Sequence, residues 1–338
     1  MINRIYKLVG TKKIEVVMRE LDLEGKKVIV RPTYLSICAA DLRYYFGQRK
    51  KEVLRKKLPL ALIHEGIGKV LYDPCNRFAV GENVVMLPNI SGTILPYVKE
   101  NYLSDSIFMS SSADGFMQDM VGMQVEQLIK IPNGDRVYVL SELMSVAFNT
   151  IMEFENTAHP RRRAVGIWGD GNVGFVVALA LKYLYPSLCV SVIGKHSKHL
   201  QYFSFADQCY LVDELPESIQ FDHCFECVGG CGSAEAISQM VEHILPAGSI
   251  ALMGVSENEV LINTRKILEK GLKLYGNSRS SREDFQKSVD LITDYPEVAS
   301  YLQTIISQVQ MVRGVEDIYT AFEHNETGDF KTVMKWNV

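Results

Sequence analysis

The sequence lacks any long apolar run. No stretch of its 338 residues approaches the roughly 18 consecutive apolar residues of a membrane span, and its beginning has no apolar signal segment with a small-residue cleavage site. It also lacks an excess of positive charge, since 36 Lys and Arg residues face 40 Asp and Glu residues, a formal net charge of -4. These absences argue against a membrane or a nucleic acid as the main partner. We therefore expect a cytoplasmic protein that acts on a small molecule.

The seven cysteines are scattered along the sequence and suit a reducing compartment. Cys224, Cys227 and Cys231 have a spacing that suggests a zinc knuckle. The surrounding residues 221–230, however, predict a buried strand that ends in a glycine turn, with Cys224 and Cys227 on nearly opposite faces. This pattern favours a structural role over a metal site.

The chain is about twice the length of a typical domain, so two domains are expected. Residues 13 to about 138 contain short β-rich runs separated by turns, whereas residues 163 to about 277 alternate strands with helices. The pattern predicts an α/β protein with a β-rich domain over residues 1–147 and 282–338 and a doubly wound domain over residues 148–281. A last strand over residues 329–336 should complete the first domain.

A strand-like run at residues 165–168 leads into a G-x-G-x-x-G turn, followed by a helix-like apolar run and a second strand at residues 188–194. Such a βαβ unit holds a pyrophosphate with the backbone N–H groups of its turn and the dipole of its helix. A purely structural glycine turn is the alternative. We predict a dinucleotide site formed by Gly169, Gly171, Asn172, Val173 and Gly174.

The end of the second strand indicates which dinucleotide is bound. Sheets that bind NAD usually place an Asp or Glu there for the ribose 2′-OH, whereas a 2′-phosphate requires cations. The sequence has no acid at this point and instead has Lys195, His196 and Lys198. We therefore predict NADPH over NADH, although a solvated loop with incidental charge would look the same.

Metal-binding residue types occur in the first domain. Cys38 lies in a loop after a predicted strand, and the pair His64 and Glu65 lies just before another. One thiolate, one imidazole and one or two carboxylates can bind a zinc ion and leave a position open for substrate. Taken singly each signal is weak, because a lone Cys is usually a small core residue and a His-Glu pair is usually a surface coincidence.

Taken in order, four segments resemble the zinc-containing alcohol dehydrogenases of the medium-chain dehydrogenase/reductase family. The segments are Cys38 with Asp41, the run His64-Glu65-x-x-Gly68-x-Val70, the acidic stretch at residues 141–147, and the turn at residues 169–174. The likeness covers nearly the whole chain and implies a GroES-like catalytic domain followed by a Rossmann domain. It also implies that Cys38, His64 and Glu142 are the zinc ligands and that Glu65 can enter or leave the coordination shell.

The sequence departs from that family in three ways. Most relatives carry Ser or Thr where this chain has Ala40, so the usual proton relay is missing. Many carry His where this chain has Arg43, which cannot shuttle protons but binds oxyanions well. No cysteine lies in residues 81–112, where the structural zinc of other members is held, so we expect a single zinc.

Arg43 leads into a basic stretch at residues 48–57, which is either a solvated helix face or a site that captures a phosphorylated substrate. Within the family the chain looks most similar to bacterial ribulose-5-phosphate reductases, which make ribitol 5-phosphate for teichoic acid or capsule polymers. The resemblance implies NADPH-dependent reduction of D-ribulose 5-phosphate, with zinc polarising the ketone. The proton would arrive through water, relayed by Glu65 or Glu142.

Two other functions remain open at this point. A polyol dehydrogenase of the sorbitol or threonine type would oxidise its substrate with NAD, although Lys195 and Lys198 argue against it. A non-catalytic nucleotide-binding protein would be marked by loss of the zinc ligands, which are present. The resemblance further implies a homodimer paired through strands near residues 248–276. Whether a cytidylyltransferase is a physical partner or only a neighbour in the pathway is open.

Overall fold

The computed structural model describes residues 1–21, 23, 25–93, 95–99, 102–327 and 330–338. The chain divides into two compact units, Met1–Ser145 with Arg279–Val338, and Val146–Ser278. The boundaries expected from the sequence, at 147/148 and 281/282, lie within three residues of these limits. The first unit therefore contains both ends of the described chain.

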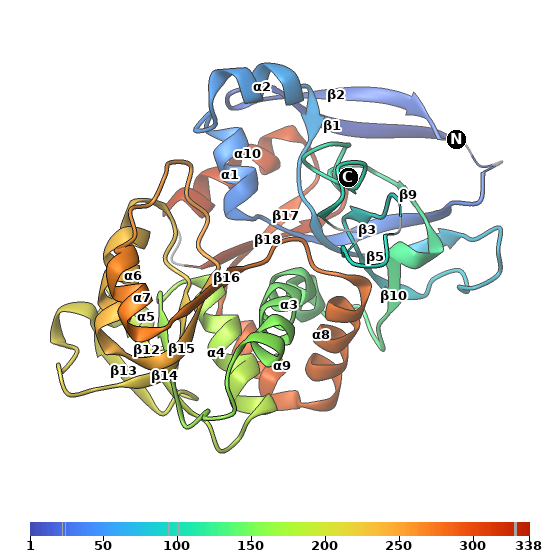
Figure 1. The fold of residues 1–338 in the computed structure, drawn as a ribbon. Helices are drawn as coiled ribbons and strands as arrows, with labels where there is room; N and C mark the ends of the chain where they lie inside the picture. Colours follow the sequence, from blue (N-terminus) through green and yellow to red (C-terminus); the bar gives the residue numbers. More distant parts are fainter. Residues whose placement is uncertain (22, 24, 94, 100–101, 328–329) are drawn as a thin grey trace. The chain divides into compact units, whose positions relative to one another are not determined.

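The first unit is built mainly on two sheets (Figure 1). A three-stranded antiparallel sheet has the order β2 (Lys13–Glu20), β1 (Ile2–Gly10) and β4 (Leu60–Ala61). A larger sheet has the order β10 (Leu128–Lys130), β6 (Asn83–Met86), β5 (Glu65–Tyr72), β3 (Val28–Ser36), β18 (Lys331–Trp336) and β17 (Ile306–Val312), with β9 (Val121–Met123) paired to β3. The short strands β7 (Asn89–Ile90) and β8 (Ile107–Phe108) pair separately.

The expected last strand is present as β18, although residue 329 lies outside the described residues. β18 pairs with β3 in antiparallel register, with Val333 opposite Ser36. Ser36 ends β3, only two residues before Cys38. The C-terminal strand is therefore next to the loop that carries the predicted cysteine ligand.

Among the residues that the structure describes, the α-helices wholly in the first unit are α1 (Ala39–Tyr45), α2 (Lys51–Lys57), α8 (Arg282–Asp294), α9 (Pro296–Thr304) and α10 (Val315–Thr327). α10 packs on β17 and β18 and also contacts α1. The ring of Tyr45 stacks on that of Phe322, with centroids 4.4 Å apart. Burial of aromatic rings of this size contributes about 2 kcal/mol each, so this contact fixes the helix that begins directly after Cys38.

The second unit is a doubly wound parallel sheet. Its order is β13 (Gln208–Leu211), β12 (Cys189–Gly194), β11 (Ala164–Trp168), β14 (Phe221–Glu226), β15 (Ile244–Leu252) and β16 (Lys273–Gly276). The helices are the C-terminal part of α3 (Ser141–Thr157), then α4 (Asn172–Leu184), α5 (Ser197–Leu200), α6 (Ser233–His243) and α7 (Thr264–Lys270). Every residue of β14 is buried, which confirms the buried strand expected around Cys224.

One helical stretch among the described residues, Arg136–Thr157, has the length and composition of a membrane span. Its most apolar window is 78% buried inside the molecule, as in the core helix of a globular protein.

Candidate functional site

Asp41 joins the two segments that carry the predicted zinc ligands. It lies at the third position of α1, where its carboxylate accepts the backbone N–H of Cys38 at 3.1 Å. The other carboxylate oxygen accepts the backbone N–H of Ile63 at 3.0 Å. Asp41 is almost fully buried, so it ties the Cys38 loop to the start of β5.

The residue before His64 adopts an unusual backbone conformation. Ile63 has φ of +70°, which is rare for a β-branched side chain and costs about 1–3 kcal/mol. Its N–H donates to Asp41, and its carbonyl accepts the N–H of Phe116 at 2.8 Å. These bonds hold the sharp turn that places His64 and Glu65 at the entry to β5.

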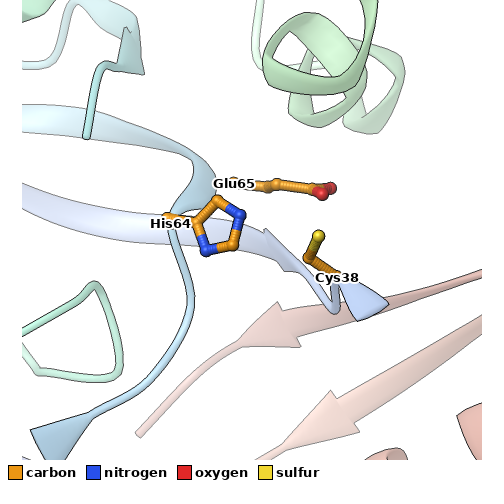
Figure 2. Close-up of side chains that lie close together, drawn as sticks. All are labelled: Cys38, His64 and Glu65. Atoms are coloured by element: carbon orange, nitrogen blue, oxygen red, sulfur yellow. The ribbon is translucent and has the colours of Figure 1, made fainter. Parts of the chain in front are cut away.

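The side chains of Cys38, His64 and Glu65 converge on one another, as Figure 2 shows. One potential ligand atom from each residue lies within 4.8 Å of the other two. His64 Nδ1 lies 2.8 Å from Ser110 Oγ and 3.6 Å from Asp41 Oδ1. Contacts of this kind orient a metal-binding imidazole.

The electrostatics around His64 favour a positive charge. Burial opposes protonation of this ring, but the neighbouring Asp41 and Cys38 outweigh burial and raise the pKa of His64 well above its usual value. Burial likewise opposes ionisation of Asp41, yet His64 and the two backbone N–H donors lower the pKa of that carboxyl. A cation between these groups is therefore stabilised.

Lys331 is a partner of Glu65 that sequence reasoning did not identify. Its Nζ lies 2.5 and 2.7 Å from the two carboxylate oxygens of Glu65 and donates to the carbonyl of Ile37 at 3.2 Å. Both side chains are buried. Burial opposes the charge on Lys331, but Glu65 and Cys38 raise its pKa. The only sequence signal was a lysine at the start of a predicted core strand.

Glu142 is the second residue of α3 and is not part of the close group formed by Cys38, His64 and Glu65. Burial is the main cause that raises the pKa of Glu142 to about 7; His64 opposes the shift and Glu65 adds to it. The positive groups near Glu142 do not offset the cost of burying its negative charge. A nearby metal ion would supply the missing charge.

The residues present fit a zinc ion. A thiol, an imidazole nitrogen and carboxylates are the donors that zinc prefers, at about 2.0–2.3 Å from the metal. Cys38 and His64 already lie close together, and the raised pKa of Glu142 is consistent with a third ligand beside a cation. Glu65 is paired with Lys331, which competes with a metal ion for its carboxylate.

The predicted basic stretch follows α1, whose last turn carries Arg43. Arg49 lies over the ring of Tyr44, 5.1 Å from its centroid. Burial lowers the pKa of Lys57, and the charges of Lys56, Arg279 and Arg49 lower it further. The charge of Arg279, which is more than 200 residues away in the sequence and was not predicted, therefore acts on Lys57.

The predicted dinucleotide turn in the second unit depends on its glycines. Gly169 has φ of +127°, and a Cβ there would lie 2.7 Å from the backbone of Cys227. A Cβ on Gly174 would lie 1.9 Å from the carbonyl oxygen of Gly169. Larger residues at these positions would displace the turn from the start of α4, which is capped by Gly171.

A cavity of about 560 Å³ lies beside this turn. Gly169, Gly171, Lys195 and His196 of the predicted set line it, whereas Asn172, Val173 and Gly174 form the first turn of α4 and Lys198 is exposed on α5. Asp170 and His199 also line it and were not predicted. Ligand atoms of Asp170, His196 and His199 lie within 4.8 Å of one another.

Comparison with known proteins identifies the family. The alcohol dehydrogenase GroES-like domain family matches residues 24–133, and the zinc-binding dehydrogenase family matches residues 201–294. The chain is 47% identical to a ribulose-5-phosphate reductase of Bacillus spizizenii, over 100% of both chains. The chain belongs to the zinc-binding alcohol dehydrogenase family. Its predicted family and its fold class, a GroES-like domain with a Rossmann domain, are confirmed.

Other members of the zinc-binding alcohol dehydrogenase family are similar over the full length. Ribulose-5-phosphate reductase 2 of Staphylococcus aureus is 46% identical over 100% of both chains. The crystal structure of S. aureus TarJ in complex with NADPH matches with a TM-score of 0.89 and 41% identity, again over 100% of both chains. L-idonate 5-dehydrogenase of Escherichia coli, at 18% identity and a TM-score of 0.85, shares the fold.

Proposed function

We propose that this chain is an NADPH-dependent reductase that converts D-ribulose 5-phosphate to D-ribitol 5-phosphate. The observation that carries the proposal is the 47% identity, over the full length, to a ribulose-5-phosphate reductase. The zinc-type donor group of Cys38, His64 and Glu65 supports the chemistry. The product would feed the synthesis of CDP-ribitol and of teichoic acid or capsule polymers.

We assign the zinc site to Cys38, His64 and Glu142, with Glu65 as a carboxylate that can join or leave. When bound, zinc supplies a Lewis acid that polarises the ketone oxygen. Asp41 fixes the loop of Cys38 relative to His64, and Lys331 holds the carboxylate of Glu65.

The alkoxide that forms during reduction must receive a proton. Ala40 has no hydroxyl group to pass one from solvent. We propose that a water molecule delivers the proton, with the carboxyl of Glu142 as one relay when it is not bound to the metal. Glu65 is the alternative relay, but its carboxylate is engaged by Lys331.

We assign NADPH to the second unit, with its pyrophosphate at the turn formed by Gly169, Gly171, Asn172, Val173 and Gly174. NADPH supplies the hydride that the carbonyl carbon receives. Lys195, His196 and Lys198 provide positive charge for the 2′-phosphate; Lys195 and His196 line the cavity beside the turn.

The substrate phosphate requires cations in the first unit. Arg43 lies in the last turn of α1, and burial together with the charges of Lys56, Arg279 and Arg49 lowers the pKa of Lys57. Repulsion of this kind is relieved by a phosphate group, which carries close to two negative charges at neutral pH. We propose that these cations hold the phosphate of the sugar.

The proposed activity is tested by the initial rate of NADPH oxidation with D-ribulose 5-phosphate. Unphosphorylated D-ribulose, and NADH in place of NADPH, are the controls. We expect a strong preference for the phosphorylated ketose and for NADPH. Equal rates with sorbitol-type polyols and NAD would instead assign the chain to the polyol dehydrogenases, and a protein that holds no zinc would favour a non-catalytic role.

We further propose that residues 1–147 with 282–338 form the catalytic domain and residues 148–281 the NADP-binding domain, in a cytoplasmic homodimer. β16 is an edge strand of the parallel sheet, and the nearby Leu261 and Leu268 are 89% and 80% exposed. An exposed sheet edge beside apolar side chains invites pairing with a second copy. Light scattering after gel filtration measures the molar mass and therefore the number of subunits. A co-elution experiment with the cytidylyltransferase tests physical association.

A further inference from the structure

Asp170 is an acid inside the glycine turn, and its carboxylate is directed at the loop after β12. One oxygen, Oδ2, accepts the backbone N–H of His196 at 2.6 Å and lies 3.1 Å from Nδ1 of the same residue. The other oxygen, Oδ1, lies 3.9 Å from Nδ1 of His199. The side chain of Asp170 is only 11% exposed. The carboxylate therefore faces two imidazole rings and accepts a hydrogen bond from one backbone amide.

Asp170 also determines what can occupy the end of β12. Gly194 is the last residue of that strand, the region where NAD-binding sheets place an acid for the ribose 2′-OH. A Cβ on Gly194 would lie 2.6 Å from Cβ of Asp170 and 2.8 Å from its Oδ2. Asp170 fills the space that a side chain at position 194 would need.

The charges that line this cavity are mixed. The positive or protonatable groups are Lys195, His196 and His199, and the acids are Asp170, Asp213 and Glu235. A bare carboxylate in this cavity would repel a 2′-phosphate. Because Asp170 accepts the backbone N–H of His196 and faces the ring nitrogens of His196 and His199, its charge is offset by the residues that it holds.

We propose that Asp170 is a positioning residue for the 2′-phosphate of NADPH. It fixes the backbone and the ring of His196 and faces His199, so that both imidazoles and Lys195 are held around a single anion. His199 thereby joins the phosphate-binding set. The inference rests on the proposed use of NADPH and adds to it the residues that select the 2′-phosphate.

Direct titration of NADPH and NADH binding, followed by nucleotide fluorescence, tests the inference. Asp170→Ala should weaken NADPH binding about tenfold or more, equivalent to about 1.4 kcal/mol, and leave NADH binding within about twofold. Asp170→Asn keeps an oxygen that can accept the N–H of His196, so it should restore most of the NADPH affinity. If Asp170→Ala weakens NADH equally, or tightens NADPH, the carboxylate does not position the phosphate site.

Two further variants separate positioning from a general structural effect. Asp207 accepts the backbone N–H of Val190 at 2.7 Å at the other end of β12, so Asp207→Ala loses a similar bond without a change in the ratio of the two affinities. The double variant Asp170→Ala/His196→Ala should lose less NADPH affinity than the sum of the two single losses, because part of the effect of Asp170 passes through His196. Fully additive losses would overturn the idea that Asp170 acts through His196.

The binding measurement requires no substrate. A protein that selects NADPH through Asp170 but does not reduce D-ribulose 5-phosphate would disprove the proposed reaction and leave this inference standing. If the protein reduces the sugar phosphate but its Asp170→Ala variant keeps the preference for NADPH, the proposed reaction stands and this inference is disproved.

Discussion

Replacement of Lys331 by methionine tests how the Glu65 carboxylate is held. Lys331 and Glu65 form a buried pair at 2.5 and 2.7 Å, and the side chain of Glu65 is fully buried. Methionine keeps the volume of the lysine stem but removes the charge. Loss of one partner of such a pair leaves an uncompensated buried charge and typically costs about 3–5 kcal/mol.

The measurement is the free energy of unfolding of the metal-free protein in denaturant, wild type beside Lys331→Met. We expect a loss of about 3–5 kcal/mol, and the double variant Lys331→Met/Glu65→Gln should recover much of it because no buried charge remains. Zinc should also reduce the loss, since a freed Glu65 can bind the metal. A difference below about 1 kcal/mol in the metal-free protein, typical of an exposed ion pair, would refute the reasoning.

The structure leads to four further predictions, at the zinc site, the glycine turn, the basic group and a buried histidine. Cys38→Ser and His64→Ala should lose bound zinc, measured by elemental analysis, and lower kcat/KM at least about a hundredfold, because the Lewis acid is worth several kcal/mol. Gly174→Ala should weaken NADPH binding and stability together, since its Cβ would meet a carbonyl oxygen at 1.9 Å. Arg279→Gln should raise KM for D-ribulose 5-phosphate about tenfold through the loss of a charged contact, without affecting unphosphorylated D-ribulose. Burial and a neighbouring histidine lower the pKa of His223 to about 4. Stability from this residue is therefore fully present above pH 6.5 and lost as pH falls toward 4, by about 3 kcal/mol. His223→Gln should flatten the pH dependence of the free energy of unfolding in that window.

Control variants and contradicting outcomes are available for several of these predictions. A Cβ on Gly171 would meet nothing within 4 Å, so Gly171→Ala should leave stability unchanged where Gly174→Ala lowers it. Ser249 donates its backbone N–H to Nδ1 of His223 at 3.1 Å, so protonation of that nitrogen would break this bond. A wild-type pH dependence that survives in His223→Gln would assign the effect to other groups. Retained zinc and turnover in both ligand variants would contradict the assigned site.

Local patterns in the sequence predicted the family and the fold class. The glycine turn could be found because its spacing expresses a steric requirement within six consecutive residues, and the pair His64 and Glu65 could be found because both lie at one strand entry. The alternation of strands and helices likewise predicted the parallel sheet. In these cases the determining contacts are close in the sequence.

The unpredicted residues depend on contacts between distant segments. Lys331 reaches Glu65 across 266 residues because β18 pairs with β3, which pairs with β5. Arg279 joins Lys57 only in the folded unit. In the sequence, Asp170 occupies a variable position of the glycine turn. Its hydrogen bond to His196 depends on how β11 and β12 align, so the sequence does not reveal it. Strand pairing, which the sequence pattern does not specify, determines the contacts of Lys331 and Asp170.

The identity of the product tests the central claim most directly. The zinc-loaded protein is incubated with D-ribulose 5-phosphate and NADPH that carries deuterium on the transferred position, and the product is analysed by mass spectrometry. We predict ribitol 5-phosphate that carries one deuterium at C2, formed with NADPH consumption in equal amounts. Unlabelled product, or consumption of NADPH without ribitol 5-phosphate, would contradict the proposed hydride transfer.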